Sequence, residues 1–147
     1  MTTVNIYLNF NGNCAEAFNF YKSVFGGEFR TLRKFIDIVK QKDAPSPAEK
    51  MQNKIMHVSL PVSTETMLMG SDTDGEWFGH GYQHGNNFSI STYTDNKEEA
   101  ERLFNGLSDG GQISMPIQDT FWGEYFGMFT DKFGINWMVS FKKEETK

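Results

Sequence analysis

The sequence predicts an α+β fold built from two βαβββ modules, and three kinds of observation carry this prediction. Several segments alternate apolar and polar residues with period two, which is typical of strands with one buried face. Two other segments place apolar residues at helical spacing and end at paired glycines, Gly26-Gly27 and Gly110-Gly111. The order strand, helix and three strands occurs twice within 147 residues, so we expect one domain, residues 1–147, with an internal duplication.

The first module is predicted at about residues 1–71. Its first strand is expected at 4–10, where apolar Val4, Ile6 and Leu8 alternate with polar Asn5, Tyr7 and Asn9. Asn13 is expected to cap the following helix, with Glu16 three residues later as in a capping box. Further strands are predicted at 28–37, 54–62 and 66–71. Segment 39–53, which mixes charges with two prolines, is predicted to be a long loop.

The second module is predicted at about residues 87–141, joined to the first by a glycine-rich loop, 72–86. Strands are expected at 87–94, 112–118, 124–130 and 135–141. Asn96 is expected to cap the helix between the first two, with Glu98 and Glu99 in its first turn. The two helices align at an offset of 83 residues, which pairs Ala17 with Ala100, Tyr21 with Phe104 and Val24 with Leu107. Their shared apolar positions support two copies of one module packed face to face.

Composition narrows the classes of partner. The net charge of −5 disfavours nucleic acid and anionic membranes, which attract clustered Lys and Arg. No apolar run approaches the ~20 residues that cross a bilayer, and the first residues lack a secretory signal, so a cytoplasmic location is expected. The lone Cys14 falls in the apolar stripe of the first helix and is predicted to be a small core residue. A small molecule is therefore the expected partner.

Three stretches, YLNFNGNCAEAFNFYKSVFGGEF, MLMGSD and TFWGEYFGMFTDKFGINWM, together with the repeated order of elements, resemble the vicinal oxygen chelate superfamily. That superfamily includes glyoxalase I, bleomycin-resistance proteins and extradiol dioxygenases, and the resemblance is to its PhnB-like branch, often labelled by similarity to a demethylubiquinone methyltransferase. The resemblance covers nearly the whole chain, with 11–27 and 120–137 as its most specific parts. No strand, glycine loop and helix suited to a nucleotide-like cofactor supports a methyltransferase, so no cofactor is expected.

The resemblance implies that each module curls a mostly antiparallel sheet into a half-open barrel, with the helix outside and a cavity inside, and that the protein is a homodimer. Apolar residues such as Val4, Phe88 and Ile90 would then pack beneath helices. Strand 124–130 is apolar on both faces and is expected to be covered on both. The residues expected to line the ligand cavity are Asn5, Tyr7, Asn9, His57, Met69, Ser89, Ser91, Tyr93, Trp122, Tyr125 and Met138.

Metal-dependent members of that superfamily carry a His or Gln on the first strand of a module and a Glu at particular strand ends, which leaves an open catalytic metal site. By the resemblance, the equivalent positions in this sequence hold Asn5, Ser89, Met69 and Met138. An amide, a hydroxyl and two thioethers lack the charge and basicity that a catalytic Ni, Zn or Fe site needs. We therefore expect no metal at this place.

Histidines offer the remaining candidates for chemistry. His57 alternates with Ile55 and Ser59 on a predicted strand, and is either an acid, base or hydrogen-bond donor in the cavity or a structural residue. His80 and His84, in GHGYQHG, are four residues apart on a glycine-rich loop, which does not place both imidazoles on one face as a helix would. Loops 39–53 and 72–86 are candidates for lids over the cavity.

These observations favour a small-molecule binding protein without the superfamily metal, taking an apolar ligand that is partly aromatic or cationic. Two alternatives remain open. One is a general acid-base enzyme, lyase-like or isomerase-like, that acts on a small carbonyl substrate through His57. The other is a metal-dependent enzyme of the glyoxalase or dioxygenase type with a different ligand set.

Overall fold

The structure, a computed structural model, describes residues 2–38, 49–73 and 81–142. The chain divides into two compact units, Met1–Gln83 and His84–Lys147. Each unit contains one four-stranded sheet. Whether the two form a single domain stays a prediction.

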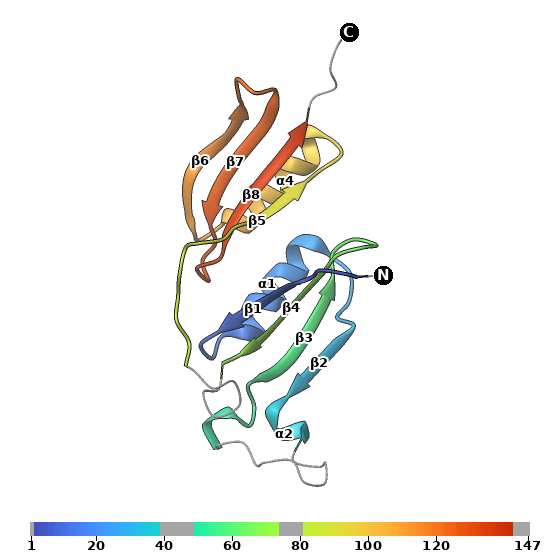
Figure 1. The fold of residues 1–147 in the computed structure, drawn as a ribbon, viewed down its shortest axis with the longest axis vertical. Coiled ribbons are helices and arrows are strands. Elements are labelled where there is room, and N and C mark those ends of the chain that lie inside the picture. Colours follow the sequence, from blue (N-terminus) through green and yellow to red (C-terminus); the bar gives the residue numbers. More distant parts are fainter. Residues whose placement is uncertain (1, 39–48, 74–80, 143–147) are drawn as a thin grey trace. The chain divides into compact units, whose positions relative to one another are not determined.

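The first unit contains sheet A, whose strands lie in the order β1-β4-β3-β2 (Figure 1). Its elements are β1 (Ile6–Phe10), α1 (Cys14–Phe25), β2 (Thr31–Lys34), α2 (Phe35–Ile38), a 3-10 turn (Glu49–Met51), β3 (Ile55–Pro61) and β4 (Met67–Asp72). Strands β1 and β4 are parallel, whereas β3 is antiparallel to both of its neighbours.

The second unit contains sheet B, in the order β5-β8-β7-β6. Its elements are β5 (Ile90–Tyr93), α4 (Lys97–Ser108), β6 (Gln112–Asp119), β7 (Glu124–Thr130) and β8 (Asn136–Lys142). Again the first and last strands pair in parallel and the other pairs are antiparallel. The two units thus share one topology, which confirms the predicted duplication and the α+β class. Within the described residues both sheets are open layers rather than a closed barrel.

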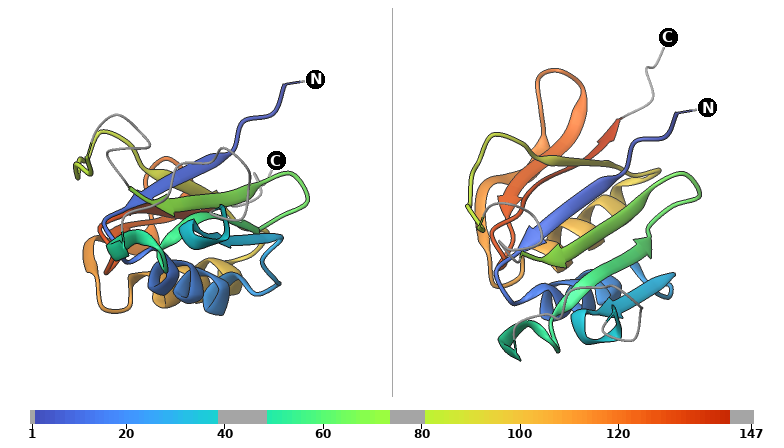
Figure 2. Two further views of the ribbon diagram at one scale, coloured as in Figure 1. Left: turned by 90° about the horizontal axis from the view of Figure 1, so that it is seen from below. Right: turned by 60° about the horizontal axis from the view of Figure 1, so that its bottom comes forward.

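One long helix covers one face of each sheet. Helix α1 contacts β3 and β4, and α4 contacts the last three strands of sheet B. Figure 2 shows α1 on one side of sheet A. The buried residues of the helices recur at helical spacing: Cys14, Ala17, Phe18, Tyr21 and Val24 in α1, and Ala100, Leu103, Phe104 and Leu107 in α4. Cys14 is therefore the core residue that was predicted, and burial raises the pKa of its thiol.

Helix α1 approaches sheet A most closely at Gly70. A Cβ added to Gly70 would lie 2.7 Å from Cε2 of Phe18 and 2.9 Å from the carbonyl oxygen of Leu8, so a side chain does not fit at this position. Gly70 therefore faces α1, and because strand residues alternate, Met69 and Ser71 face away from it.

The two helices begin in different ways. Asn96 has an extended backbone, and its side-chain oxygen accepts a hydrogen bond from the Glu99 N–H at 2.8 Å, as predicted. Asn13 occupies the same place before α1 but makes no side-chain capping bond. Instead, Oδ1 of Asp72 accepts a hydrogen bond from the Cys14 N–H at 3.0 Å. The predicted capping box at Asn13 is therefore wrong, because a carboxylate from β4 takes its place.

Several predicted strands were too long at their first residues. Val4 and Phe88 precede β1 and β5 and are 87% and 55% exposed, so neither packs beneath a helix. The predicted strand 28–37 is limited to β2, because Phe35 turns into α2 and is fully buried against Met51.

The described part of the chain contains no helix long and apolar enough to cross a membrane. Most of loop 39–53, and His80 with much of loop 72–86, lie outside the described residues. His84 is described, and its Nε2 lies 3.0 Å from the carbonyl oxygen of Gly134.

Candidate functional site

Sheet A presents one face away from α1, which we call distal face A. Tyr7 of β1 and Met69 of β4 are register partners on this face, and Met69 is in turn paired with Ser59 of β3. Asn9 lies two residues after Tyr7 and is exposed. The polar residues of the first strand thus lie on the face away from the helix, as the alternation predicted.

Tyr7 and His57 meet on distal face A. Their rings are stacked, with centroids 5.8 Å apart and planes inclined by 25°. Oη of Tyr7 lies 3.5 Å from Nδ1 of His57, at the long end of hydrogen-bonding distance. His57 is half-buried rather than covered by α1, so its imidazole is placed where a bound molecule can reach it.

Sheet B has a corresponding face, distal face B, turned away from α4. A Cβ on Gly127 would lie 2.6 Å from Cε2 of Phe104, so Gly127 faces the helix and its neighbours Phe126 and Met128 face away. The strand register places a row of thioethers across this face: Met138 of β8 pairs with Met128 of β7, and Met128 pairs with Met115 of β6. Ser91 of β5 is the register partner of Met138 at the end of the row.

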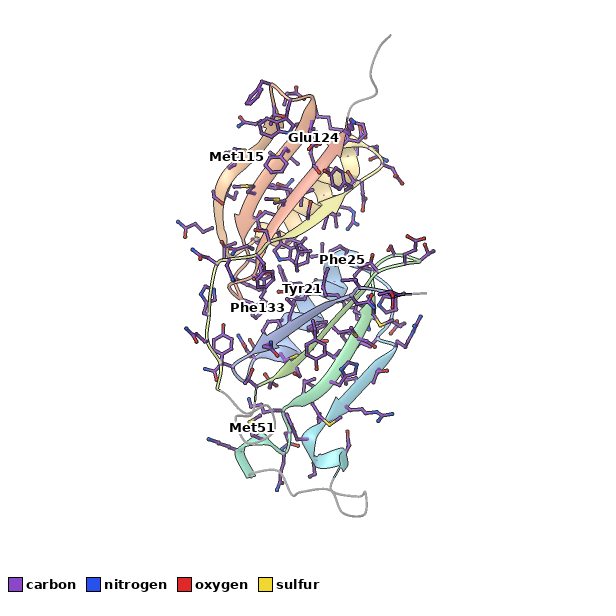
Figure 3. All side chains as sticks on the ribbon, in the orientation of Figure 1. Tyr21, Phe25, Met51, Met115, Glu124 and Phe133 are labelled. Carbon is purple, nitrogen blue, oxygen red and sulfur yellow. The ribbon has the colours of Figure 1, made fainter. Side chains whose placement is uncertain are left out.

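Aromatic rings extend this row toward the β6–β7 turn. The ring of Trp122 lies 5.6 Å from that of Phe126 and 4.9 Å from that of Phe121, centroid to centroid. Trp122 is 47% exposed and Phe121 98% exposed. Figure 3 labels Met115 on β6 and Glu124 at the start of β7.

The sequence analysis named Ser91, Trp122 and Met138 of distal face B but missed the side chains between them, Met115, Phe126 and Met128. The apolar residues Phe126 and Met128 led to the expectation that β7 is covered on both faces, but both side chains are half-buried. Only the alternate residues, Tyr125, Gly127 and Phe129, are buried. The period-two alternation of β7 shows that Met128 shares a face with Phe126. Met115 could be placed on this face only from the register between β6 and β7.

Tyr125 does not join Trp122 on this face. It is 9% exposed on the α4 side, where its hydroxyl donates a 2.8 Å hydrogen bond to Oε1 of Glu101. This hydrogen bond raises the pKa of Tyr125 to about 12, with burial and the Glu101 charge acting in the same direction. Nζ of Lys97 lies 4.9 Å from the ring centroid. Tyr125 therefore connects the sheet to its helix.

The remaining candidate residues are scattered. Asn5 and Ser89 precede β1 and β5, and Oδ1 of Asn5 accepts a 3.2 Å hydrogen bond from the Met67 N–H. Ser91 and Tyr93 lie on β5 away from buried Ile90, and Tyr93 is 68% exposed. The structure thus brings Tyr7, His57 and Met69 together in one unit, and places Ser91, Met138 and Trp122 on one face of the other.

The donor set does not fit the metal site that the resemblance implies. Asn5 uses its side-chain oxygen on the backbone, and the other aligned positions offer a hydroxyl and two thioethers. Among the described residues, no group of three or more His, Cys, Asp or Glu side chains is arranged to hold a metal ion. We therefore derive no step through a metal.

Sequence comparison agrees with this fold. The family model of the Glyoxalase/Bleomycin resistance protein/Dioxygenase superfamily matches residues 3–139. Protein YjdN of Escherichia coli (strain K12) is 30% identical over 144 residues, which cover 95% of each chain.

Solved structures with a similar fold support the same assignment. Protein PA1353 from Pseudomonas aeruginosa superposes with a TM-score of 0.82 at 41% identity, covering 98% of this chain and 100% of that one. The PhnB protein from Bacillus cereus superposes with a TM-score of 0.72 at 22% identity, covering 95% of this chain and 99% of that one. The second likeness is one of fold.

Proposed function

This chain belongs to the Glyoxalase/Bleomycin resistance protein/Dioxygenase superfamily, and we propose that it is a small-molecule binding protein that holds an apolar, partly aromatic ligand on distal face B. The observation that carries the proposal is the row Met115–Met128–Met138, continued by Phe126 and Trp122, on a face that α4 does not cover. Half-buried thioethers and aromatic rings still expose apolar area to water. A bound apolar ligand that covers this area is stabilised by the hydrophobic effect.

The chemistry of this face favours a flat and weakly charged ligand. Methionine side chains are flexible and polarizable, so they adapt to ligands of different outline. Glu124 shares the alternation of Phe126 and Met128, and its register partner across the sheet is Lys142. A cation near Glu124 would also meet Lys142, so a neutral aromatic compound is the better match.

Binding of N-phenyl-1-naphthylamine, a neutral aromatic fluorophore, tests this proposal. In a Trp77→Phe background, Trp122 and buried Trp137 are the remaining tryptophans, and the fluorophore is expected to quench Trp122. Met128→Gln is expected to weaken binding about tenfold, because an amide replaces an apolar contact.

The matched control is Ile113→Gln, since Ile113 is 48% exposed on β6 but is the register partner of Phe129, which faces α4. Ile113→Gln is expected to leave the affinity unchanged. Equal losses in both variants, or no quenching of Trp122, would contradict the proposed face.

The contact between Tyr7 and His57 favours a second candidate, a general acid-base enzyme acting on a small carbonyl compound. His57 would remove a proton from the carbon next to the carbonyl, and the carbon would regain a proton from solvent. The test is deuterium uptake by dihydroxyacetone in D₂O, followed by NMR. Uptake that exceeds the buffer rate and falls with His57→Asn supports the candidate, whereas uptake at the buffer rate removes it.

A further inference from the structure

Two hydroxyl groups at the end of β4 are buried without a hydrogen-bond partner. Oγ of Ser71 and Oγ1 of Thr73 are the buried side-chain polar atoms left unpaired among the described residues. Ser71 is 0% exposed. A buried hydroxyl without a partner costs free energy in the folded state. Two of them within three residues, at Ser71 and Thr73, therefore suggest that a hydrogen-bonding partner binds here.

The Ser71 hydroxyl belongs to distal face A, and Thr73 is the first residue after β4. Gly70 and Asp72 face α1. A Cβ on Gly70 would meet the Phe18 ring, and the Asp72 carboxylate accepts a hydrogen bond from the Cys14 N–H. Ser71 therefore lies on the opposite face. Thr73 follows β4 directly, and its N–H donates to the Phe10 carbonyl oxygen at 2.7 Å. Ser71 is the register partner of exposed Asn9 on β1.

The internal duplication provides a built-in comparison. Ser71 follows Met69 by two residues on the strand paired in parallel with β1, and Ser140 follows Met138 by two residues on the strand paired in parallel with β5. Ser140 is equally buried, but its hydroxyl donates to the Thr92 carbonyl oxygen at 3.4 Å. The same position of the repeat is thus paired in sheet B and unpaired in sheet A, so the fold alone does not require an orphan hydroxyl here.

The neighbouring strands of sheet A carry further hydrogen-bond donors and a positive charge on the same face. When the Tyr7 hydroxyl donates to Nδ1 of His57, the neutral imidazole carries its proton on Nε2, which is then a hydrogen-bond donor. Arg33 of β2 is the register partner of His57 and is exposed, with no ion pair among the described residues. The four strands of sheet A contain a single carboxylate, Asp72, and it faces α1.

We propose that distal face A carries an oxyanion site at the end of β4, which binds the carboxylate group of a small organic acid. Ser71 and Thr73 donate to its oxygens, His57 donates from Nε2, and Arg33 supplies the opposite charge. Because Ser71 is fully buried, binding of the acid requires a side chain of distal face A to move; Met69, its neighbour two residues earlier on this face, is half-buried and flexible.

The residues of this site belong to the first unit, whereas those of the proposed aromatic site on distal face B belong to the second. Acetate, which offers little apolar surface, is the appropriate probe. The full chain labelled with ¹⁵N is titrated with acetate, and the backbone amides of Ser71 and Thr73 report binding by NMR. The amides of β7 and β8 report distal face B and are expected not to move.

Variants separate a ligand site from a structural defect. Ser71→Ala is expected to weaken acetate binding about tenfold while unfolding at an equal or higher temperature, because it removes an unpaired hydroxyl. Ser140→Ala, the matched control, is expected to unfold at a lower temperature and to bind acetate as before. Arg33→Gln is expected to weaken binding several-fold and to reduce its dependence on salt.

Three results would overturn the proposal. The first is an unchanged spectrum at Ser71 and Thr73 at saturating acetate. The second is a loss of stability in Ser71→Ala with acetate binding intact, since the hydroxyls would then hold a structural water. The third is binding of inorganic phosphate in the absence of any binding of acetate, which would contradict the assignment to a carboxylate.

Discussion

Asp72 shows how one buried side chain joins three segments of the first unit. It lies on β4, is 1% exposed, and its two carboxylate oxygens accept hydrogen bonds from the Cys14 N–H at 3.0 Å and the Ile55 N–H at 2.9 Å. It thereby caps α1 and fixes the first residue of β3. A carboxylate suits both bonds because each of its oxygens is an acceptor.

Asp72→Asn is expected to lower the free energy of unfolding by about 2 kcal/mol, because an amide presents only one acceptor and leaves one buried N–H unpaired. Urea denaturation measures the change. Asp95→Asn, an exposed aspartate before α4, is the control and is expected to change stability little. Equal stability of the Asp72 variant and the wild type would show that water replaces the lost acceptor.

Tyr125 provides a prediction about titration. The hydrogen bond to Glu101 raises the pKa of Tyr125 to about 12, compared with an ordinary value of about 10. Because the folded-state pKa is the higher one, this contact stabilises the protein fully below about pH 10, and the contribution is lost as the pH rises toward 12.

The measurement is the ¹³Cζ shift of labelled tyrosines as the pH is raised, with Tyr125→Phe identifying the signal. Glu101→Gln is expected to move the midpoint of Tyr125 back toward its ordinary value. A Tyr125 signal with its midpoint at the ordinary tyrosine value of about 10 would contradict the role assigned to the carboxylate.

At the scale of elements, the two helices make a matched pair for testing capping. Asn96 and Asn13 stand immediately before α4 and α1, but only Asn96 uses its side chain on the helix. Asn96→Ala is expected to cost about 1 kcal/mol of stability, which is typical of a lost N-cap. Asn13→Ala is expected to cost clearly less, because Asp72 already serves the Cys14 N–H. Chemical denaturation of both variants checks the difference, and similar losses would show that Asn13 caps α1 in solution.

Elements with strong local patterns could be predicted from sequence. The apolar stripe of α1 follows from its helical spacing. The helix ends at Gly26, because glycine tolerates the φ of +82° found there. Strand β7 was predicted with its observed bounds, Glu124–Thr130. The first residues of β1 and β5 were not, because Val4 and Phe88 continue the alternation into segments without strand partners. The alternation of apolar and polar residues shows which residues share a face of the sheet. It does not show where hydrogen bonding to the neighbouring strand ends.

The candidate sites depend on contacts across the whole unit, which a single sequence shows poorly. Tyr7 and His57 are 50 residues apart in the sequence. They lie on β1 and β3, and their side chains meet across β4, the strand between them. The alternation of polar and apolar residues in the first strand nevertheless predicted that Tyr7 lies on the face away from the helix. Tyr125 was assigned to the ligand because it neighbours Trp122, but the turn after Trp122 places the two on opposite faces. The homodimer implied by the resemblance stays a prediction, which sedimentation equilibrium against the 16.8 kDa chain mass would test.

At the scale of the whole molecule, each unit has a buried core of its own. Val58 in β3 and Val139 in β8 are both 0% exposed, and each lies beneath the helix of its unit. Shortening either side chain to alanine leaves a small cavity, and we expect hydrogen exchange to accelerate in the unit that carries it. Val139→Ala should lower protection in β5 to β8 and leave β3 and β4 nearly unchanged, and Val58→Ala should do the reverse. Hydrogen-exchange mass spectrometry resolves the two sets of peptides. Equal acceleration throughout the chain in both variants would mean that the units open as one cooperative body, as expected of the single domain predicted from the sequence.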